Sequence, residues 1–159
     1  MDRGYTNSPH KTKSVSYCFL KWPNIARIDS MKSCCMDYNC IQCCLETSMP
    51  LSNLDIKRIS RLGFDTNFFV TERDGWLQLK NHDGRCVFHS GKICSIYKDR
   101  PEGCKLYPII YDKDKNCAIF DEDCPHRNKF QMSKSIIKQL YVIVSKLECE
   151  MAKRKRNDG

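Results

Sequence analysis

Cysteine spacing constrains the fold of this chain more than any other feature of its sequence. Two groups stand out among the twelve cysteines, and they are Cys35-x4-Cys40-x2-Cys43-Cys44 and Cys86-x7-Cys94-x9-Cys104. Without an export signal, thiolates at this density are held by metal more often than they are joined in disulfides. The sequence therefore predicts a fold that is organised around a metal site.

The N-terminal segment carries no targeting pattern. Residues 1–13 are polar, and the apolar stretch at 15–20 is too short for the apolar region of about 7–15 residues that a secretory signal needs. The longest apolar helical stretch, 136–147, is interrupted by lysines and other polar residues, so we expect no segment that spans a bilayer. These features predict a cytoplasmic protein with reduced cysteines.

Length and charge limit the alternatives. At 159 residues we expect a mobile leader at 1–15, a single cysteine-cluster domain at 16–151 and a basic tail at 152–159. The net charge of +8 would suit an anionic partner such as nucleic acid. Metal-bound thiolates would offset this positive charge. The basic residues are also spread along the chain, apart from the run at 153–156. We therefore do not favour nucleic-acid binding.

One helix and one short strand are predicted in the middle of the chain. The helix begins at Ser52 or Asn53, either of which can cap it, and stops at Gly63. Asp65 is expected to cap a short turn that follows, and residues 86–88 have the pattern of a strand. The helix carries an apolar set that consists of Leu54, Ile56, Ile59 and Leu62.

Two hairpins and a closing helix complete the predicted fold. The segments 69–73 and 76–80 flank Asp74-Gly75, a dipeptide that suits a type I′ turn. A second hairpin joins 109–111 to 117–120. A long helix at about 133–151 carries apolar residues at helical spacing and should pack on the small sheet. The fold class is therefore α+β, with small antiparallel hairpins and a few helices around a cysteine-rich metal site.

The first cysteine group has an arrangement that a single ion explains poorly. A Cys-x2-Cys pair such as Cys40 and Cys43 lets two thiolates converge on one ion. Cys44 follows Cys43 directly, and the side chains of neighbouring residues in an extended chain diverge. Adjacent cysteines therefore suit two metals, an iron–sulfur cluster, or one metal plus a separate thiol. Four thiolates would close one zinc site, whereas eight would hold two zinc ions or two clusters.

A family resemblance follows from a longer string of motifs. It contains Cys40-x2-Cys43-Cys44, a helix with Asp55 and Arg58-Ile59, Gly63-Phe64, Gly84-x-Cys86-x-Phe88, and Cys94-x-Ile96-Tyr97-x2-Arg100-Pro101-x2-Cys104-x2-Tyr107-Pro108. Over residues 34–125 the chain resembles the CxxCxxCC, or YkgJ-like, family of zinc- or iron-chelating cysteine-cluster domains. The resemblance implies a bound metal, whether zinc, iron or an iron–sulfur cluster.

The resemblance also implies a set of ligands. The family's leading cysteine usually stands where this chain has Asp37, so Cys35 or its neighbour Cys34 must substitute for it. A late Cys-Pro resembles Cys124-Pro125, which makes Cys124 the eighth candidate and Cys117 the reserve. Cys18 and Cys149 lie outside the pattern. The implied metal ligands are Cys35, Cys40, Cys43, Cys44, Cys86, Cys94, Cys104 and Cys124.

Other residues near the cysteines are open to two interpretations. Arg100 would either donate to the sulfurs or lock the loop that presents Cys94 and Cys104, and we favour the locking role. His89 and His126 are the only histidines close in sequence to cysteines, and both are candidates for testing. Tyr107 is expected to line the site.

Three classes of function fit these features. The chain is a metalloprotein with redox or group-transfer chemistry, a structural-zinc module that binds nucleic acid or a protein partner, or a protein that handles and passes on metal. It has no glycine-rich phosphate cradle and no Ser-His-Asp set, so the sequence leaves open whether it is an enzyme. Metal binding is the function that all three classes share.

Overall fold

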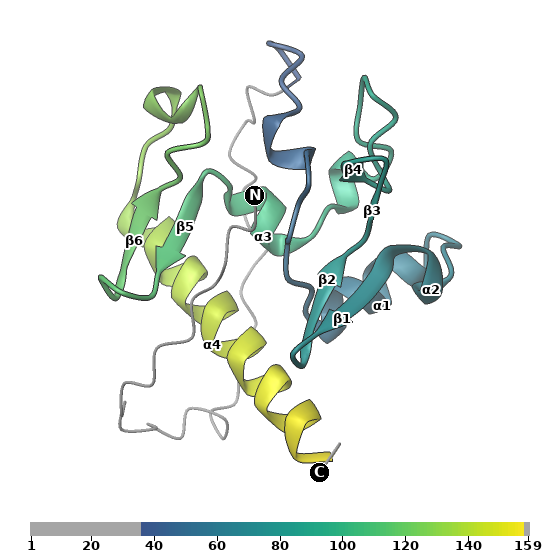
Figure 1. Cartoon of the computed structure of the whole chain (residues 1–159). Coiled ribbons are helices and arrows are strands. Elements are labelled where there is room, and N and C mark those ends of the chain that lie inside the picture. The colour runs from purple at the N-terminus through teal and green to yellow at the C-terminus, as the bar shows by residue number, and fades with distance from the viewer. Residues whose placement is uncertain (1–35, 158–159) are drawn as a thin grey trace.

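The computed structural model describes residues 36–157, and the predicted leader together with Cys18, Cys34 and Cys35 lies outside the described residues. The described part is α+β, as predicted, with three two-stranded antiparallel sheets and a long helix, α4 (Lys134–Asn157). In Figure 1 two hairpins lie on either side of α3 (Glu102–Leu106), and α4 runs diagonally past all three. One hairpin consists of β1 (Val70–Arg73) and β2 (Trp76–Leu79), and the other of β5 (Ile109–Asp112) and β6 (Cys117–Phe120). No helix in the described part is long and apolar enough to cross a membrane.

Helix α1 (Asn53–Ser60) begins where the sequence predicted. The Ser52 side chain accepts from the backbone N–H of Asp55, and the Asp55 carboxylate accepts from the backbone N–H of Ser52, which completes a capping box. The predicted apolar set is not one buried face, because Leu54 is 59% exposed and Leu62 46% exposed. Instead α1 buries Asp55 together with Ile59, so a carboxylate occupies the inward face.

The hairpin around Asp74-Gly75 is confirmed. Strands β1 (Val70–Arg73) and β2 (Trp76–Leu79) pair antiparallel and follow the short helix α2 (Thr66–Phe69), which Asp65 caps. Asp74 has φ 53° and Gly75 has φ 78°, the positive angles that a type I′ turn requires at both central positions.

A second hairpin of the same kind was not predicted. Strands β3 (Asn81–His82) and β4 (Arg85–Cys86) flank Asp83 and Gly84, which also have positive φ angles. The predicted strand at 86–88 is wrong beyond its first residue, because the chain turns there. The backbone N–H of His89 donates to the carbonyl of Cys86 at 2.8 Å.

The third hairpin and the closing helix form a second core. Strands β5 (Ile109–Asp112) and β6 (Cys117–Phe120) pair as predicted, and α3 (Glu102–Leu106) precedes them. α4 packs on this unit and also contacts β2. The buried residues of this core are Leu106, Ile109 and Leu140, with Tyr111, Ala118, Phe120, Met132, Ile136, Ile143 and Val144 packed against them.

The last turns of α4 reach the other half of the molecule. The run of basic residues at 153–156 is helical, because α4 continues to Asn157. Arg154 Nε donates to the backbone carbonyl of Gly75 at 2.9 Å. Glu150 accepts from the backbone N–H of Asn53 at 2.8 Å. The end of α4 thus ties the β1–β2 turn to the start of α1.

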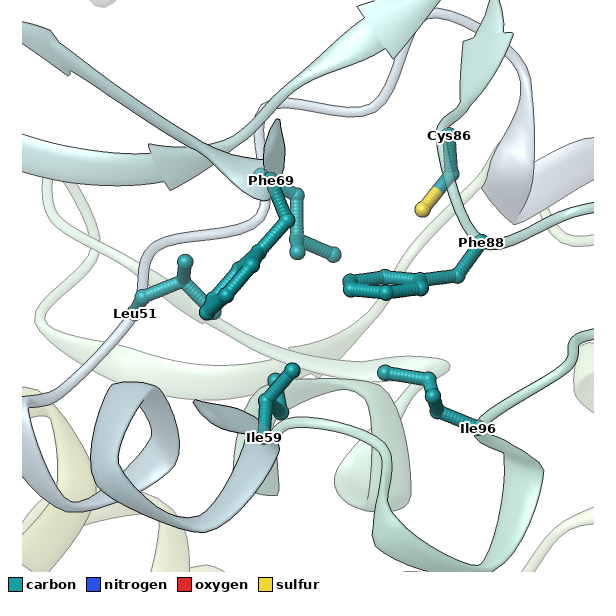
Figure 2. Close-up of a cluster of buried hydrophobic side chains, with 7 residues drawn as sticks. Leu51, Ile59, Phe69, Cys86, Phe88 and Ile96 are labelled. Atoms are coloured by element: carbon teal, nitrogen blue, oxygen red, sulfur yellow. The ribbon is translucent and has the colours of Figure 1, made fainter. Parts of the chain in front are cut away.

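The first core lies under β1 and β2 and includes a sulfur. Figure 2 shows the Cys86 side chain pointing into a cluster of buried apolar side chains. Short 3-10 helices in the described part of the chain are η2 (Gln42–Cys44), η3 (Tyr97–Asp99) and η4 (Arg127–Lys129). The buried cluster consists of Leu51, Ile59, Phe69, Leu79, Cys86, Phe88 and Ile96, and the partly buried Cys44, Cys94 and Cys104 pack against it.

Candidate metal centre

Cys104 lies at the centre of the group of cysteines that the fold brings together. It stands on α3, three residues after Pro101, which is buried and lies at the N-cap position of the helix. Burial raises the pKa of the Cys104 thiol well above its ordinary value. The charges that raise this pKa further belong to Cys43, Cys86, Cys94 and Asp55. Three other cysteines, from η2, β4 and the loop after β4, therefore lie close enough to Cys104 for their charges to affect it.

Cys86 and Cys94 are held in two equivalent turns. The Cys86 sulfur accepts a hydrogen bond from the backbone N–H of Phe88, and the Cys94 sulfur accepts one from Ile96. In both turns the carbonyl of the cysteine accepts from the N–H three residues later, at 2.8 Å from His89 and 3.2 Å from Tyr97. Backbone N–H groups aimed at sulfur favour the thiolate, which is the form that binds metal.

The pKa values of these two thiols are nevertheless raised. Burial is the largest cause for both. The charge of Cys94 adds to the rise in the pKa of Cys86, whereas the Arg100 guanidinium opposes the rise in the pKa of Cys94. A divalent cation would remove the penalty by supplying the opposite charge, because metal binding and thiol deprotonation are coupled.

The adjacent cysteines of η2 make different contacts. Leu45 pairs with Arg85 in an isolated antiparallel bridge, and the N–H of Glu46 donates to the carbonyl of Gly84 at 2.8 Å. The bridge brings η2 beside β4, and Cys44, which precedes Leu45, packs against the buried cluster that contains Cys86. Cys43 instead influences Cys104, as described above, and also Tyr107.

Cys124 lies near Tyr107. It is buried, with 5% of its surface exposed, in the turn that follows β6. The pKa of Tyr107 is raised by burial and by the charge of Asp121 and a hydrogen bond to it, and the charges of Cys124 and Cys43 raise it further. Tyr107 therefore has Cys124 and Cys43 as neighbours, which is compatible with the predicted position at the wall of the site.

Two predicted candidates stand apart from this group. Cys117, the reserve ligand, begins β6 opposite Asp112, and its charge influences Tyr111 in the second core. Cys40 is half-buried just before η2. The structure describes no interaction of Cys40 with the sulfurs around Cys104, and the predicted ligand Cys35 lies outside the described residues.

The two histidines and Arg100 occupy structural positions. His89 Nδ1 accepts from the backbone N–H of Gly91 at 3.0 Å, and burial lowers the pKa of this imidazole. The His126 ring stacks on Tyr38 with the centroids 4.7 Å apart. Arg100 is buried, donates to the carbonyl of Tyr97 at 2.6 Å and lies 4.1 Å above the Tyr97 ring. It therefore braces the loop between Cys94 and Cys104, as we expected.

Comparison with known proteins agrees with this geometry. Residues 34–149 match the family model CxxCxxCC, described as "Putative zinc- or iron-chelating domain". The chain belongs to the CxxCxxCC family. The matched segment extends past residue 125, where the motifs end, and takes in α4 as far as Cys149, which we had placed outside the pattern. No curated protein and no solved structure matches the chain.

The donor atoms of this CxxCxxCC site fit a metal. Among residues 36–157 no three His, Cys, Asp or Glu side chains are already drawn together closely enough to hold an ion. The fit depends instead on the donors themselves, which are sulfurs of the kind that zinc and iron prefer. Eight of the nine described cysteines are reduced, whereas Cys149 is in a disulfide, so the prediction of reduced cysteines is wrong for Cys149. The turns around Cys86 and Cys94 direct N–H groups at two of the reduced sulfurs, which suit zinc, iron or an iron–sulfur cluster.

Sequence reasoning missed one part of this CxxCxxCC site. Asp55 and Arg58 belong to the motifs quoted above, but the spacing of residues along the chain predicted no role for them in the site. In the structure Asp55 is 2% exposed, and its charge reaches Cys104. The only signal in the sequence was the position of Asp55 three residues after Ser52, which indicates a capping box and nothing about a cysteine 49 residues later.

Proposed function

We propose that this protein binds zinc or iron through the cysteines that surround Cys104. The single observation that carries the proposal is the packing of Cys44, Cys94 and Cys104, from η2, the loop after β4 and α3, against the buried cluster that contains Cys86. Buried cysteines can also act as small apolar residues. A purely apolar role would not require backbone N–H groups directed at the sulfurs, as they are at Cys86 and Cys94.

The number of sulfurs supports a site with more than one metal atom. One tetrahedral zinc ion takes four thiolates. Cys44 packs against the same cluster as Cys86, Cys94 and Cys104, and Cys43 adds a further sulfur, so the described residues already exceed that number. We therefore propose an iron–sulfur cluster or up to two ions, with the ligands Cys35, Cys40, Cys43, Cys44, Cys86, Cys94, Cys104 and Cys124.

The described residues have separate tasks in such a site. The N–H groups of Phe88 and Ile96 stabilise the thiolates of Cys86 and Cys94, and Arg100 adds a positive charge near Cys94. Tyr107 and Phe88 shield the sulfurs from water. An iron–sulfur cluster bound here would supply one-electron redox chemistry, whereas zinc would supply none. The eight reduced thiols among the described residues suit the reducing, cytoplasmic location that the sequence predicts, whereas the disulfide of Cys149 does not.

Metal analysis of protein purified without oxygen tests the proposal. We expect zinc or iron in a fixed ratio to protein, and a broad visible absorption with acid-labile sulfide if a cluster is present. Colourless protein with stoichiometric zinc and no sulfide would rule out the cluster. Protein that holds neither metal after reconstitution with zinc, with iron, or with iron and sulfide would overturn metal binding altogether.

The same samples separate the alternative functions. Zinc that resists a strong chelator, together with binding of labelled RNA or DNA that weakens steeply with salt, would indicate a structural-zinc module. Zinc or iron that passes readily to a chelator or to a metal-free acceptor would indicate metal handling.

A further inference from the structure

Helix α1 contains no cysteine, but two of its side chains bind the segment that joins Cys94 to Cys104. Asp55 Oδ1 accepts from the backbone N–H of Glu102 at 3.1 Å. Arg58 Nη2 donates to the carbonyl of Arg100 at 3.0 Å, and Nε donates to that of Asp99 at 3.4 Å. Arg58 Nη1 also lies 3.2 Å from Glu102 Oε1. Four contacts therefore fix residues 99–102 to α1, immediately before α3.

The Asp55 and Arg58 side chains are also held in place by contacts with each other and with Ser52. Arg58 Nη2 lies 2.7 Å from Asp55 Oδ1, which joins them into one unit. The other oxygen, Oδ2, accepts from the backbone N–H of Ser52 at 3.1 Å and from its hydroxyl at 2.8 Å. Asp55 thus has two hydrogen bonds on each oxygen and none left for a metal. A buried carboxylate with this set of donors acts by holding other groups in place.

We propose that Asp55 and Arg58 are positioning residues that set the placement of Cys104 relative to Cys94. The inference rests on the proposed function, because Cys94 and Cys104 are proposed metal ligands. The contacts that place Cys104 relative to Cys94, however, are present without metal. Glu102 begins α3, and Cys104 is two residues further on, so a shift of the Glu102 amide moves the sulfur with it. Outer-shell partners of this kind typically change metal affinity by about 10–100-fold.

The test compares four full-length variants with the unaltered protein. Asp55→Asn and Arg58→Met each disrupt the contacts between α1 and residues 99–102. Arg58→Lys keeps the positive charge but loses the planar guanidinium group. Lys57→Met is the matched control, because it removes a positive charge from an exposed position of the same helix and leaves the contacts to residues 99–102 in place. Circular dichroism confirms that each variant is folded, and Arg58, with a side chain 28% exposed, is the substitution most easily tolerated.

The first readout needs no metal. The rate at which iodoacetamide alkylates Cys104 in reduced, metal-free protein is followed by mass spectrometry. We expect it to rise at least tenfold in Asp55→Asn and Arg58→Met and to stay within about threefold in Lys57→Met. Asp55→Asn removes a negative charge and Arg58→Met a positive one. A purely electrostatic effect would therefore move the two rates in opposite directions, and that result would overturn the inference.

The second readout uses Co²⁺ and Zn²⁺ as probes. We expect Asp55→Asn, Arg58→Met and Arg58→Lys to bind zinc 10–100-fold more weakly in competition with a chelator and to alter the visible Co²⁺ spectrum. If the zinc affinity, the Co²⁺ spectrum and the alkylation rate of these variants are all unchanged, the inference is refuted, and the proposed metal binding is unaffected. If the unaltered protein binds neither ion, the alkylation rates still decide the placement of Cys104. Only failure to take up iron, with or without sulfide, in addition would refute the proposed function.

Discussion

Leu45 pairs with Arg85 in an isolated antiparallel bridge, and this bridge brings the end of η2 beside β4. Cys44, the last residue of η2, packs against the buried cluster that contains Cys86. The charge of Cys43, one residue earlier, instead affects Cys104 and Tyr107. The two adjacent cysteines of η2 therefore have different neighbours within one group of sulfurs.

Replacement of Cys104 should damage the metal site more than replacement of any peripheral cysteine. Because Cys104 is influenced by three other sulfurs, we expect Cys104→Ser to weaken zinc or iron binding by more than the roughly 10–100-fold typical of outer-shell changes. Cys117→Ser is the matched control, because Cys117 lies by Tyr111 in the second core. Metal content per chain measures both, and equal losses in the two variants would contradict the assignment.

Removal of metal should lower the thermal stability of the folded protein. Zinc at a thousand times its Kd stabilises the native state by about 4 kcal/mol, which corresponds to about 8–16 °C in Tm for a chain of this size. Differential scanning fluorimetry before and after chelator treatment measures the shift, and restored Tm on adding zinc serves as the control. Tm values that do not depend on metal would argue that the sulfurs are only packing groups.

Phe69 should contribute far more to stability than Phe68. Phe69 is completely buried in the first core, so Phe69→Ala should cost about 3–5 kcal/mol of unfolding free energy through lost burial and a cavity. Phe68 is 48% exposed, and Phe68→Ala should cost about 1 kcal/mol or less. Urea unfolding of metal-free protein measures both. Similar costs for the two substitutions would mean that the burial of these neighbours is wrongly assigned.

Arg154 should stabilise the protein although it belongs to a basic run. Arg154→Met loses the hydrogen bonds to Gly75 and to Asn53 Oδ1, the latter at 3.4 Å, and should cost about 1 kcal/mol. Arg156 is exposed, so Arg156→Met should leave stability within about 0.5 kcal/mol of the unaltered protein. Thermal unfolding compares the two, and the prediction is lost if Arg156→Met proves the more damaging.

Local chemistry accounts for the elements that sequence reasoning placed correctly. Asp74-Gly75 marks a type I′ turn because both residues accept positive φ, and longer strands on either side make the pattern visible. Asp83-Gly84 makes the same kind of turn, but its flanking strands have only two residues each. Strands that short and polar give no alternation to detect, so the hairpin went unpredicted.

Tertiary contacts account for what the sequence could not supply. The apolar spacing of α1 suggested that Leu54 and Leu62 face inward, whereas the fold turns the Asp55 face toward α3. The cysteines were identifiable from their motifs. Their convergence on Cys104 depends on chain segments that meet only in the folded protein, and no spacing rule links Asp55 to an amide 47 residues away.

The last turns of α4 have a practical consequence for anyone who prepares a shorter form of this protein. The family match ends at Cys149, one residue before Glu150 and five before Arg154. A fragment trimmed to that boundary would retain every predicted ligand and yet lose both contacts that fasten α1 and the β1–β2 turn to α4. The side chains of α1 in turn bind residues 99–102, which precede Cys104. The boundary for expression therefore belongs after Asn157, where the helix ends, and not where the family match stops.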